Sequence, residues 1–436
     1  MDIPFIKHTL DNGLDVLVHE DRRVPIVAVN VWYHVGSKNE VPGRTGFAHL
    51  FEHLMFEGSQ HYDRGYFHPL QEAGAALNGS TNADRTNYWQ VVPTNALDLA
   101  LWMESDRMGY LLPALTDAKF ENQRDVVLNE RRQNYENRPY GMAGMAIVAA
   151  LYPPDHPYHW LTIGASEDLR AAQIADVRAF FQRYYHPGNA SLALAGDVDA
   201  AAGVRLAERY FGEVPGAPRP PRVALDPCPA ASREIRLVLE DRVELPRLYL
   251  AWHSPALFGE GDAELDLVAD LLAGGKTSRL YKALVYEQRI ATEVAASQNS
   301  REAGSFFQVV ATAAPGRTLA EVERAITREI ALLADRGPTG TEMERCLAQA
   351  ESHFIFRLQT VGGFGGKSDQ LNAYNTFLGN PGFFQQDLER YRNATPQALR
   401  AAAAQYLLPQ GRVVLSVVPR GRVGLAIEAS QPVAVS

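Results

Sequence analysis

The sequence predicts an α+β fold of two homologous domains, each a mostly antiparallel sheet covered by helices. Three observations lead to this prediction. Strand-like runs with turn signals open the chain and long helical periods follow. A proline-rich stretch interrupts the chain near its midpoint, and a short pattern of the first half returns in the second. The length of 436 residues also exceeds the roughly 250 to 300 residues that one core usually supports.

The first half begins with a predicted hairpin. Ile6–Leu10 and Leu14–His19 flank Asp11-Asn12-Gly13, a sequence that favours a tight turn, and Ile26–Val35 is the next strand-like run. Helical periodicity is found in four segments, Gly46–Phe56, Asn95–Tyr110, Asp117–Glu136 and Ala172–Tyr185. Further strand-like runs lie at Ala76–Asn82, Thr86–Val92 and Ser191–Ala195. Hairpins combined with long helices indicate helices that cover one face of an antiparallel sheet.

The second half is predicted to repeat the first. Glu20–Pro25 has a counterpart in Glu240–Pro246, and both segments lie between strand-like runs. In the second half these runs are Ile235–Leu239 and Leu248–His253, with a helix expected at Ala263–Leu272. The prolines of Val214–Pro221 lack amide donors and favour an extended path. We therefore expect an N-terminal domain at 1–214, a linker at 215–222 and a C-terminal domain at 223–436.

Composition narrows the classes of function. The formal net charge of -9 argues against nucleic acid as the main partner, since such surfaces need clustered Lys and Arg. Cys228 and Cys346 are too few and too far apart for a disulfide framework or a thiolate metal site. The most apolar long segment, Met142–Leu151, is about half the length of a membrane span, so no span is expected. No signal peptide is visible at Met1–Asp11, which predicts a cytoplasmic location for the chain as given, or a periplasmic one if a leader was removed.

One short motif carries the chemistry. His49-Leu50-Phe51-Glu52-His53 places two imidazoles four residues apart, on one face of a helix, where both can bind one metal ion. Glu52 can point toward the same site and take a proton from a water molecule. His-x-x-Glu-His is the inverted form of the commoner zinc-peptidase motif.

A catalytic zinc usually takes three protein ligands, so a third must come from elsewhere in the chain. The helix predicted at 117–136 offers Glu121, Glu130 and Glu136, and spacing alone does not choose among them. His61 and His68 follow the motif, but we interpret them as surface histidines.

The block Gly46–Ser59 resembles the signature of the pitrilysin-type metallopeptidases, which include insulin-degrading enzyme and the mitochondrial processing peptidases. In that family the third ligand is a Glu on a separate helix, and the family distance leads to Glu130. The resemblance implies one zinc ion per chain, bound by His49, His53 and Glu130, with Glu52 as the general base.

The resemblance covers nearly the whole chain and is closest to small bacterial members with two homologous domains. Other matching segments are Leu77-Asn78, Thr86–Tyr88, Tyr185–Asn189 and Gly275–Tyr281. In such relatives the strand that corresponds to Ala76–Asn82 accepts the extended substrate as an added strand, which makes Asn78 a candidate substrate contact. The two domains are expected to face each other as a clam shell, with zinc on the wall of the first.

Two residues depart from the family pattern. Gln123 stands two helical turns before Glu130, where many relatives carry a Glu, and we expect its amide to hold a ligating histidine through a hydrogen bond. Many relatives bind substrate with an Arg and a Tyr in the second domain; here Tyr374 is kept and Asp369 replaces the Arg. This replacement suggests a homodimer, or a heterodimer with a homologous subunit that lacks the zinc motif and supplies the missing pair.

The sequence thus predicts a zinc metalloendopeptidase that hydrolyses unfolded peptides or short polypeptides enclosed between its two domains. The alternatives are a catalytic subunit that is inactive without its partner and a non-catalytic scaffold homologue. Scaffold homologues typically have degraded zinc motifs, whereas His49, Glu52, His53 and Glu130 are all present.

Overall fold

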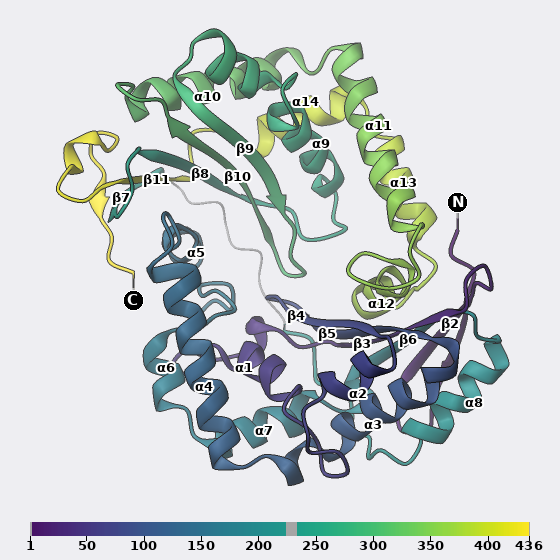
Figure 1. The fold of residues 1–436 in the computed structure, drawn as a ribbon. Coiled ribbons are helices and arrows are strands. Elements are labelled where there is room, and N and C mark those ends of the chain that lie inside the picture. The colour runs from purple at the N-terminus through teal and green to yellow at the C-terminus, as the bar shows by residue number, and fades with distance from the viewer. Residues whose placement is uncertain (1, 224–232, 436) are drawn as a thin grey trace. The chain divides into compact units, whose positions relative to one another are not determined.

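The computed structural model describes residues 2–223 and 233–435 of the chain (Figure 1). These residues form two compact units, and each unit is assembled from three separate segments. The first unit comprises Met1–Asn129, Leu161–Val223 and His353–Gln386. The second comprises Glu130–Trp160, Ala224–Ser352 and Asp387–Ser436. Cys228 lies outside the described residues.

The first unit is built on a six-stranded sheet in the order β1-β2-β6-β3-β5-β4. Its strands are β1 (Ile6–Thr9), β2 (Asp15–Glu20), β3 (Ile26–Tyr33), β4 (Ala76–Thr81), β5 (Thr86–Pro93) and β6 (Ala190–Gly196). Only the β2–β6 pair is parallel among these neighbours. The predicted hairpin is present, because β1 and β2 pair across a turn in which Gly13 has a φ of 91°. β4 is an edge strand.

Helices cover both faces of this sheet (Figure 1). α3 packs against β3 and β5, and α8 packs against β2, on the face opposite to α12. The helices of the unit are α1 (Phe47–Leu54), α2 (Phe67–Glu72), α3 (Leu97–Ala114), α4 (Asp117–Arg131), α6 (Ser166–Ala171), α7 (Ile174–Tyr184), α8 (Ala200–Phe211) and α12 (Lys367–Leu378). α4 ends within the second unit and continues as a π-helix, η3 (Arg132–Glu136).

A buried carboxylate attaches α12 to the first sheet. Asp369 accepts hydrogen bonds from Trp32 Nε1 at 2.9 Å, Asn87 Nδ2 at 3.1 Å and Asn30 Nδ2 at 3.2 Å. The backbone N–H of Gly365 donates to its other oxygen at 2.8 Å. A carboxylate can leave water at tolerable cost when donors surround it in this way. Asp369 therefore has a structural role at the position where the sequence lacks the family's Arg.

The second unit repeats the first, as the internal pattern predicted. Its sheet has the order β12-β7-β11-β8-β10-β9 and is also six-stranded. Its strands are β7 (Ile235–Asp241), β8 (Arg247–Ser254), β9 (Ala291–Asn299), β10 (Ser305–Ala313), β11 (Arg412–Pro419) and β12 (Gln431–Pro432). β7 and β11 are parallel, like β2 and β6. The repeated pattern found in the sequence thus links β2 to β3 and β7 to β8.

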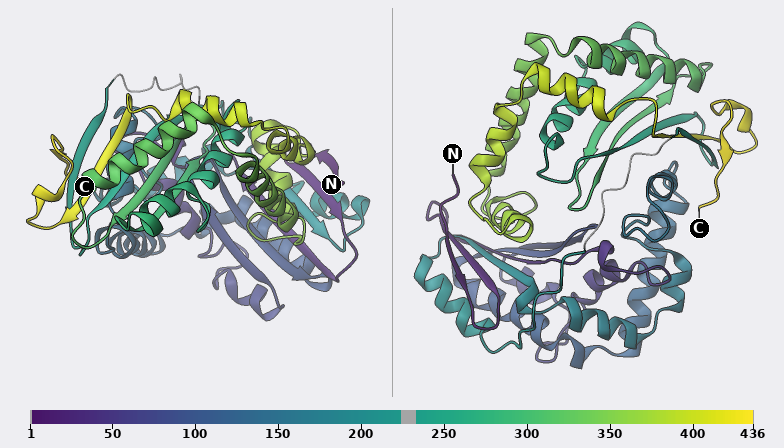
Figure 2. Two further views of the ribbon diagram at one scale, coloured as in Figure 1. Left: turned by 90° about the horizontal axis from the view of Figure 1, so that it is seen from above. Right: turned by 180° about the vertical axis from the view of Figure 1, so that it is seen from behind.

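The helices of the second unit also lie on both faces of its sheet. α9, α10 and α14 pack on one side, and α5 packs against β8 and β11; Figure 2 shows these layers from two further directions. The helices are α5 (Ala143–Leu151), α9 (Asp262–Ala273), α10 (Leu319–Arg336), α11 (Gly340–Arg357), α13 (Phe384–Arg392) and α14 (Pro396–Tyr406), with the π-helix η5 (Tyr281–Glu287). Cys346 is buried in this core, and burial raises the pKa of its thiol to about 12.

The fold class is confirmed: two halves, each with a mostly antiparallel sheet and its helices. The compact units do not follow the expected limits of 1–214 and 223–436 at two places, because 130–160 joins the second unit and 353–386 joins the first. The proline-rich segment 215–222 has no regular secondary structure, as expected, and Arg219 within it donates to the carbonyl of Gly188 at 3.1 Å.

The apolar segment noted at Met142–Leu151 is mostly helix α5, which packs on the second sheet. None of the helices in the described ranges has both the length and the apolar character required to cross a bilayer.

Replacement of Asp369 by Ala is expected to lower the free energy of unfolding by about 3 kcal/mol, because buried donors lose a charged acceptor. Urea unfolding followed by tryptophan fluorescence measures the change, and Trp32 reports on the contact directly. Asp335→Ala is the control, since the Asp335 side chain is 77% exposed; its effect should stay within about 0.5 kcal/mol. Equal midpoints for the two variants would contradict the role given to Asp369.

Candidate metal centre

The helix that carries His-x-x-Glu-His is fixed at its N-terminus by a carboxylate from the segment just before it. Gly46 is the N-cap of α1, has a φ of 89° and has no side chain to cap the helix. Glu40 instead accepts hydrogen bonds from the N–H groups of Gly46 at 3.0 Å and Ala48 at 2.8 Å. The charge of Glu40, which is buried, also complements the helix dipole at this end. The first turn of α1 is therefore held before any metal binds.

A buried cation fixes the other end of α1. Arg107 Nη1 donates to the carbonyl of Met55, just after α1, at 3.5 Å, and its Nε donates to Glu104 at 2.9 Å. Its guanidinium lies 3.9 Å from the ring centroid of Tyr66 and 4.2 Å from that of Tyr88. Burial disfavours the cation, but Glu104 outweighs this effect and raises the pKa of Arg107. Arg107 therefore remains charged beneath the helix.

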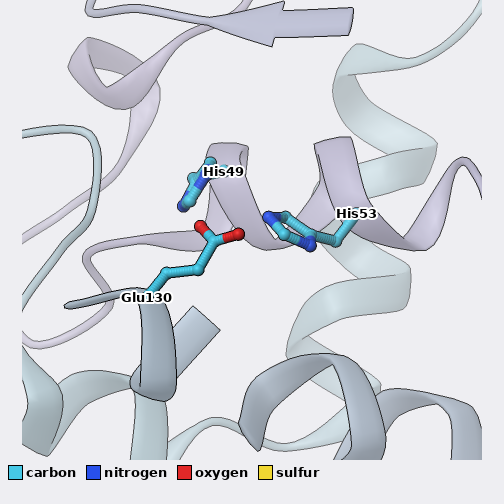
Figure 3. Close-up of side chains that lie close together, drawn as sticks. All are labelled: His49, His53 and Glu130. Carbon is cyan, nitrogen blue, oxygen red and sulfur yellow. The ribbon is translucent and has the colours of Figure 1, made fainter. Parts of the chain in front are cut away.

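The three predicted metal ligands lie together (Figure 3). His49 and His53 project from one face of α1, with ring centroids 4.9 Å apart and planes at 89°. Glu130 comes from the last turn of α4 and points its carboxylate toward both rings (Figure 3). One ligand atom from each residue lies within 4.8 Å of the other two, and all three side chains are partly buried.

This donor set suits zinc. Two imidazole nitrogens and one carboxylate oxygen are the ligands of many catalytic zinc sites, with the fourth position open. Tetrahedral ligands at the usual bond lengths lie about 3.4 Å apart, so small side-chain rotations would close the group around an ion. Burial, with a smaller contribution from His53, lowers the pKa of His49 to about 4. His49 is therefore a neutral base at physiological pH, the form that binds a metal.

The structure brings Glu130 to the histidines and leaves the other two candidate carboxylates elsewhere. The group found among the described residues contains neither Glu121 nor Glu136. Glu121 is exposed on α4. Glu136, at the end of η3, pairs with Arg131 Nε at 3.0 Å.

Glu52 is half-buried on α1, three residues after His49. Its charge contributes to the raised pKa values of the buried phenols Tyr88 and Tyr185, for which burial is the larger cause. It also favours the charged form of Arg85, whose pKa is lowered by burial. Glu52 projects from the same short helix as the two histidines. A carboxylate in this position beside the metal group can accept a proton from water.

The other predicted site residues are less directly placed. The side chain of Gln123 donates a hydrogen bond from Nε2 to the carboxylate of Glu57. This partner is a carboxylate and not the ligating histidine that the sequence suggested. Asn78 lies on the edge strand β4 and accepts from the N–H of Gly79 at 2.8 Å. Tyr374 on α12 is 2% exposed and packs edge-on against Phe383 with centroids 5.7 Å apart. This burial does not favour Tyr374 as a substrate contact, and its role stays a prediction.

Sequence reasoning missed three residues that shape the site: Glu40, Arg107 and Arg85. Of these three residues, only Arg107 has a local signal in the sequence. It follows Glu104 by three residues, about one helical turn, among apolar neighbours. Arg85 donates to the carbonyl of Ser80 at 2.8 Å and to its hydroxyl at 2.6 Å, which ties the turn to β4. His61 and His68 are exposed by 49% and 68%, as expected for surface histidines.

Family comparisons agree with this architecture. Residues 15–154 match the model described as Insulinase (Peptidase family M16), and residues 171–350 match the one described as Peptidase M16 inactive domain. The first span contains α1 and α4. The second contains no His-x-x-Glu-His sequence.

Individual relatives match most of the chain. Zinc protease PqqE of Helicobacter pylori is 28% identical over 386 residues, 87% of this chain and 86% of the relative. An uncharacterised zinc protease of Mycobacterium leprae is 27% identical over 409 residues, 92% of this chain and 88% of the relative. The crystal structure of a protease from Helicobacter pylori aligns with a TM-score of 0.86 at 25% identity, covering 96% of this chain and 100% of that one.

Two six-stranded sheets with their helices, together with a His/His/Glu group on α1 and α4, are the architecture of a two-domain metallopeptidase. The chain belongs to peptidase family M16, in its small two-domain subgroup, which confirms the resemblance to pitrilysin-type enzymes.

Glu130→Gln is expected to lower zinc affinity at least about 10-fold, because an amide oxygen carries no charge to balance the ion. Equilibrium dialysis against a zinc buffer gives the affinity without any need for activity. Glu121→Gln on the same helix is the matched control and should bind zinc like the unmodified chain. Loss of zinc from the control, with retention by Glu130→Gln, would assign the third ligand to the wrong residue.

Proposed function

We propose that this chain is a zinc metalloendopeptidase that cleaves extended, unfolded peptides. The observation that carries the proposal is the convergence of His49, His53 and Glu130 within 4.8 Å, next to Glu52. The names of the relatives support the same activity, since they are zinc proteases. The match of residues 171–350 to a domain described as inactive is compatible with it, because all four of these residues precede that span.

Zinc, when bound, supplies Lewis acidity: it polarises the scissile carbonyl and lowers the pKa of water toward neutrality. The residues of the chain do the remaining work. His49, His53 and Glu130 hold the ion, and Glu52 takes a proton from the attacking water and passes it to the leaving amine. Glu40 and Arg107 keep α1 in place, so Glu52 and the histidines keep a constant spacing during the reaction.

The substrate is proposed to bind along β4. This strand pairs with β5 on one side, and no described strand pairs with its other edge. An extended peptide can pair with the backbone along this edge as an added strand. α1 packs against β4, so a peptide on this edge would run beside the helix that carries Glu52. A folded protein offers few extended segments with free backbone groups, and the proposed substrates are therefore unfolded peptides, with Asn78 beside them.

Glu52→Gln is expected to keep zinc and to lower the turnover of a quenched, unstructured peptide by about 10³-fold, because the amide cannot accept the proton. Zinc content and initial rates are measured on the same preparation, with and without a chelator. Glu72→Gln is the control, since the Glu72 side chain is 71% exposed on α2. Undiminished turnover in Glu52→Gln would refute its role, and zinc binding without turnover in the unmodified chain would favour the scaffold alternative.

The second-domain Arg and Tyr of many relatives have no equivalent free to bind substrate here. Asp369 is engaged by the first sheet and Tyr374 is buried. Of the two predicted assemblies, a homodimer or a heterodimer with a homologue that lacks the zinc motif, this observation favours the proposal of a heterodimer, because a second copy of this chain would carry the same Asp369 and the same buried Tyr374.

Under this proposal, a zinc-loaded chain that works as a homodimer should lose turnover per chain as it is diluted. A chain that needs a different subunit should show negligible turnover at every concentration. Rates are measured across a concentration series together with the mass in solution. High turnover that stays constant down to the monomer would refute the need for a partner.

A further inference from the structure

A cavity lies in the first unit, where β4 begins. Its volume is about 500 Å³, in the range of pockets that take ligands or large side chains. Strands β3, β4 and β5 form one wall and the glycine-containing loop before α12 forms another. Its lining residues include Ile26, Ala76, Trp89, Val91, Val361 and Gly362. The walls are thus mainly apolar.

The loop approaches the sheet closely at Gly362, which has no side chain. A Cβ on Gly362 would lie 2.5 Å from Val91 Cγ2 and 2.7 Å from Ala28 Cβ. Beside it, Phe364 packs edge-on against Trp89, with centroids 5.5 Å apart, although it is 52% exposed. Val24, another lining residue, is 53% exposed. Apolar surface that remains open to water in this way commonly marks a binding site.

The cavity is continuous with the free edge of β4. Ala76 is the first residue of β4, lines the cavity and is exposed. It pairs with Val91, as Asn78 pairs with Trp89, so these four side chains share one face of the sheet. Side chains alternate along a strand. Every second side chain of a peptide added to β4 would therefore point to the face on which the cavity opens.

Trp89 adds an unsatisfied donor to the cavity wall. Its indole Nε1 is buried and has no hydrogen-bond partner within the described structure. Buried indole N–H groups usually find an acceptor.

The charges near the cavity are already paired. Asp21 accepts from Arg23 Nη2 and from Lys367 Nζ, both at 2.6 Å. The hydrogen bond from Arg23, followed by that from Lys367, holds the pKa of Asp21 well below its usual range despite some burial. A charged ligand group would have to compete with these pairs, whereas an apolar side chain gains from the walls without disturbing them.

The distance from the reacting bond follows from the register of β4. Gly79 lies against the C-terminal end of α1, since a Cβ on it would be 3.1 Å from the ring of Phe56, two residues after that helix. The reacting bond is therefore expected at the level of Gly79. Ala76 precedes Gly79 by three residues, which is roughly 10 Å along a strand.

We propose that this cavity is a specificity subsite, which accepts one apolar side chain of a peptide extended along β4, about three residues from the bond that is cleaved. The inference rests on the proposed peptidase function and adds a substrate preference to it. The ligand is a side chain of leucine or phenylalanine type.

The test uses unstructured peptides in which a single Leu is moved through successive positions and compared with Ser. Dissociation constants are measured on the zinc-loaded Glu52→Gln chain, and cleavage sites are mapped with the unmodified chain. One position, two to four residues from the cleaved bond, should favour Leu by about tenfold. Equal affinities for Leu and Ser at all positions would overturn the proposal.

Ala76→Trp fills the cavity from an exposed position and should abolish the preference for Leu over Ser. Ala295→Trp is the matched control. Ala295 lies on β9, the edge strand of the second sheet, pairs with Val310 of β10 and is also exposed. The control should keep the preference. An unchanged preference in Ala76→Trp would refute the assignment.

Val24→Asp places a charge at the rim from an exposed position and should shift the preference from Leu toward Lys. If the Leu preference stays as strong in this variant, the cavity is not the subsite. These binding measurements do not require turnover. A chain that binds peptides with the stated preference but never cleaves them would refute the peptidase proposal and leave the subsite supported.

Discussion

The candidate centre depends on how one short helix is held. α1 has eight residues, too few to be stable alone, and five of them, Phe47, Ala48, Leu50, Phe51 and Leu54, are buried. Buried groups of opposite charge hold it at both ends: Glu40 at the N–H groups and Arg107 at a carbonyl. These charges also complement the helix dipole. A rigid helix fixes the spacing of His49, Glu52 and His53, which metal binding and proton transfer both require.

The buried pair Glu104–Arg107 has a cost that only its surroundings can offset. Two ions removed from water lose several kcal/mol of hydration each, as an order of magnitude. Gln90 donates to Glu104, and the rings of Tyr66 and Tyr88 lie against the guanidinium. The arrangement restricts motion. Several partners hold the Arg107 guanidinium in one position, and its hydrogen bond to the Met55 carbonyl restrains the end of α1. Apolar side chains of equal volume would not bond to the Met55 carbonyl.

Local patterns in the sequence were sufficient for the fold class, the turn at Gly13 and the repeat of strand order. They failed where the structure depends on contacts between distant residues. The buried role of Asp369 arises from Trp32, Asn30 and Asn87, more than 280 positions away, and no periodicity reports such a contact. For the site, spacing identified His49 and His53, whereas Glu130 needed the family resemblance, because α4 offers several carboxylates. Glu40 caps α1 from outside the helix. The residues at the start of the helix therefore show no capping signal in the sequence.

The exchange of segments between the two units has a consequence for how such a chain can be divided. Residues 353–386 complete the unit built on the first sheet, and 130–160 complete the other. A cut in the proline-rich segment 215–222 would therefore not release two independent modules, since each fragment would keep a helix that belongs to the other's sheet. The molecule has the connectivity of a domain-swapped dimer joined into one polypeptide. Gene duplication followed by fusion of such a dimer would explain both the repeated strand order and the mutual dependence of the halves.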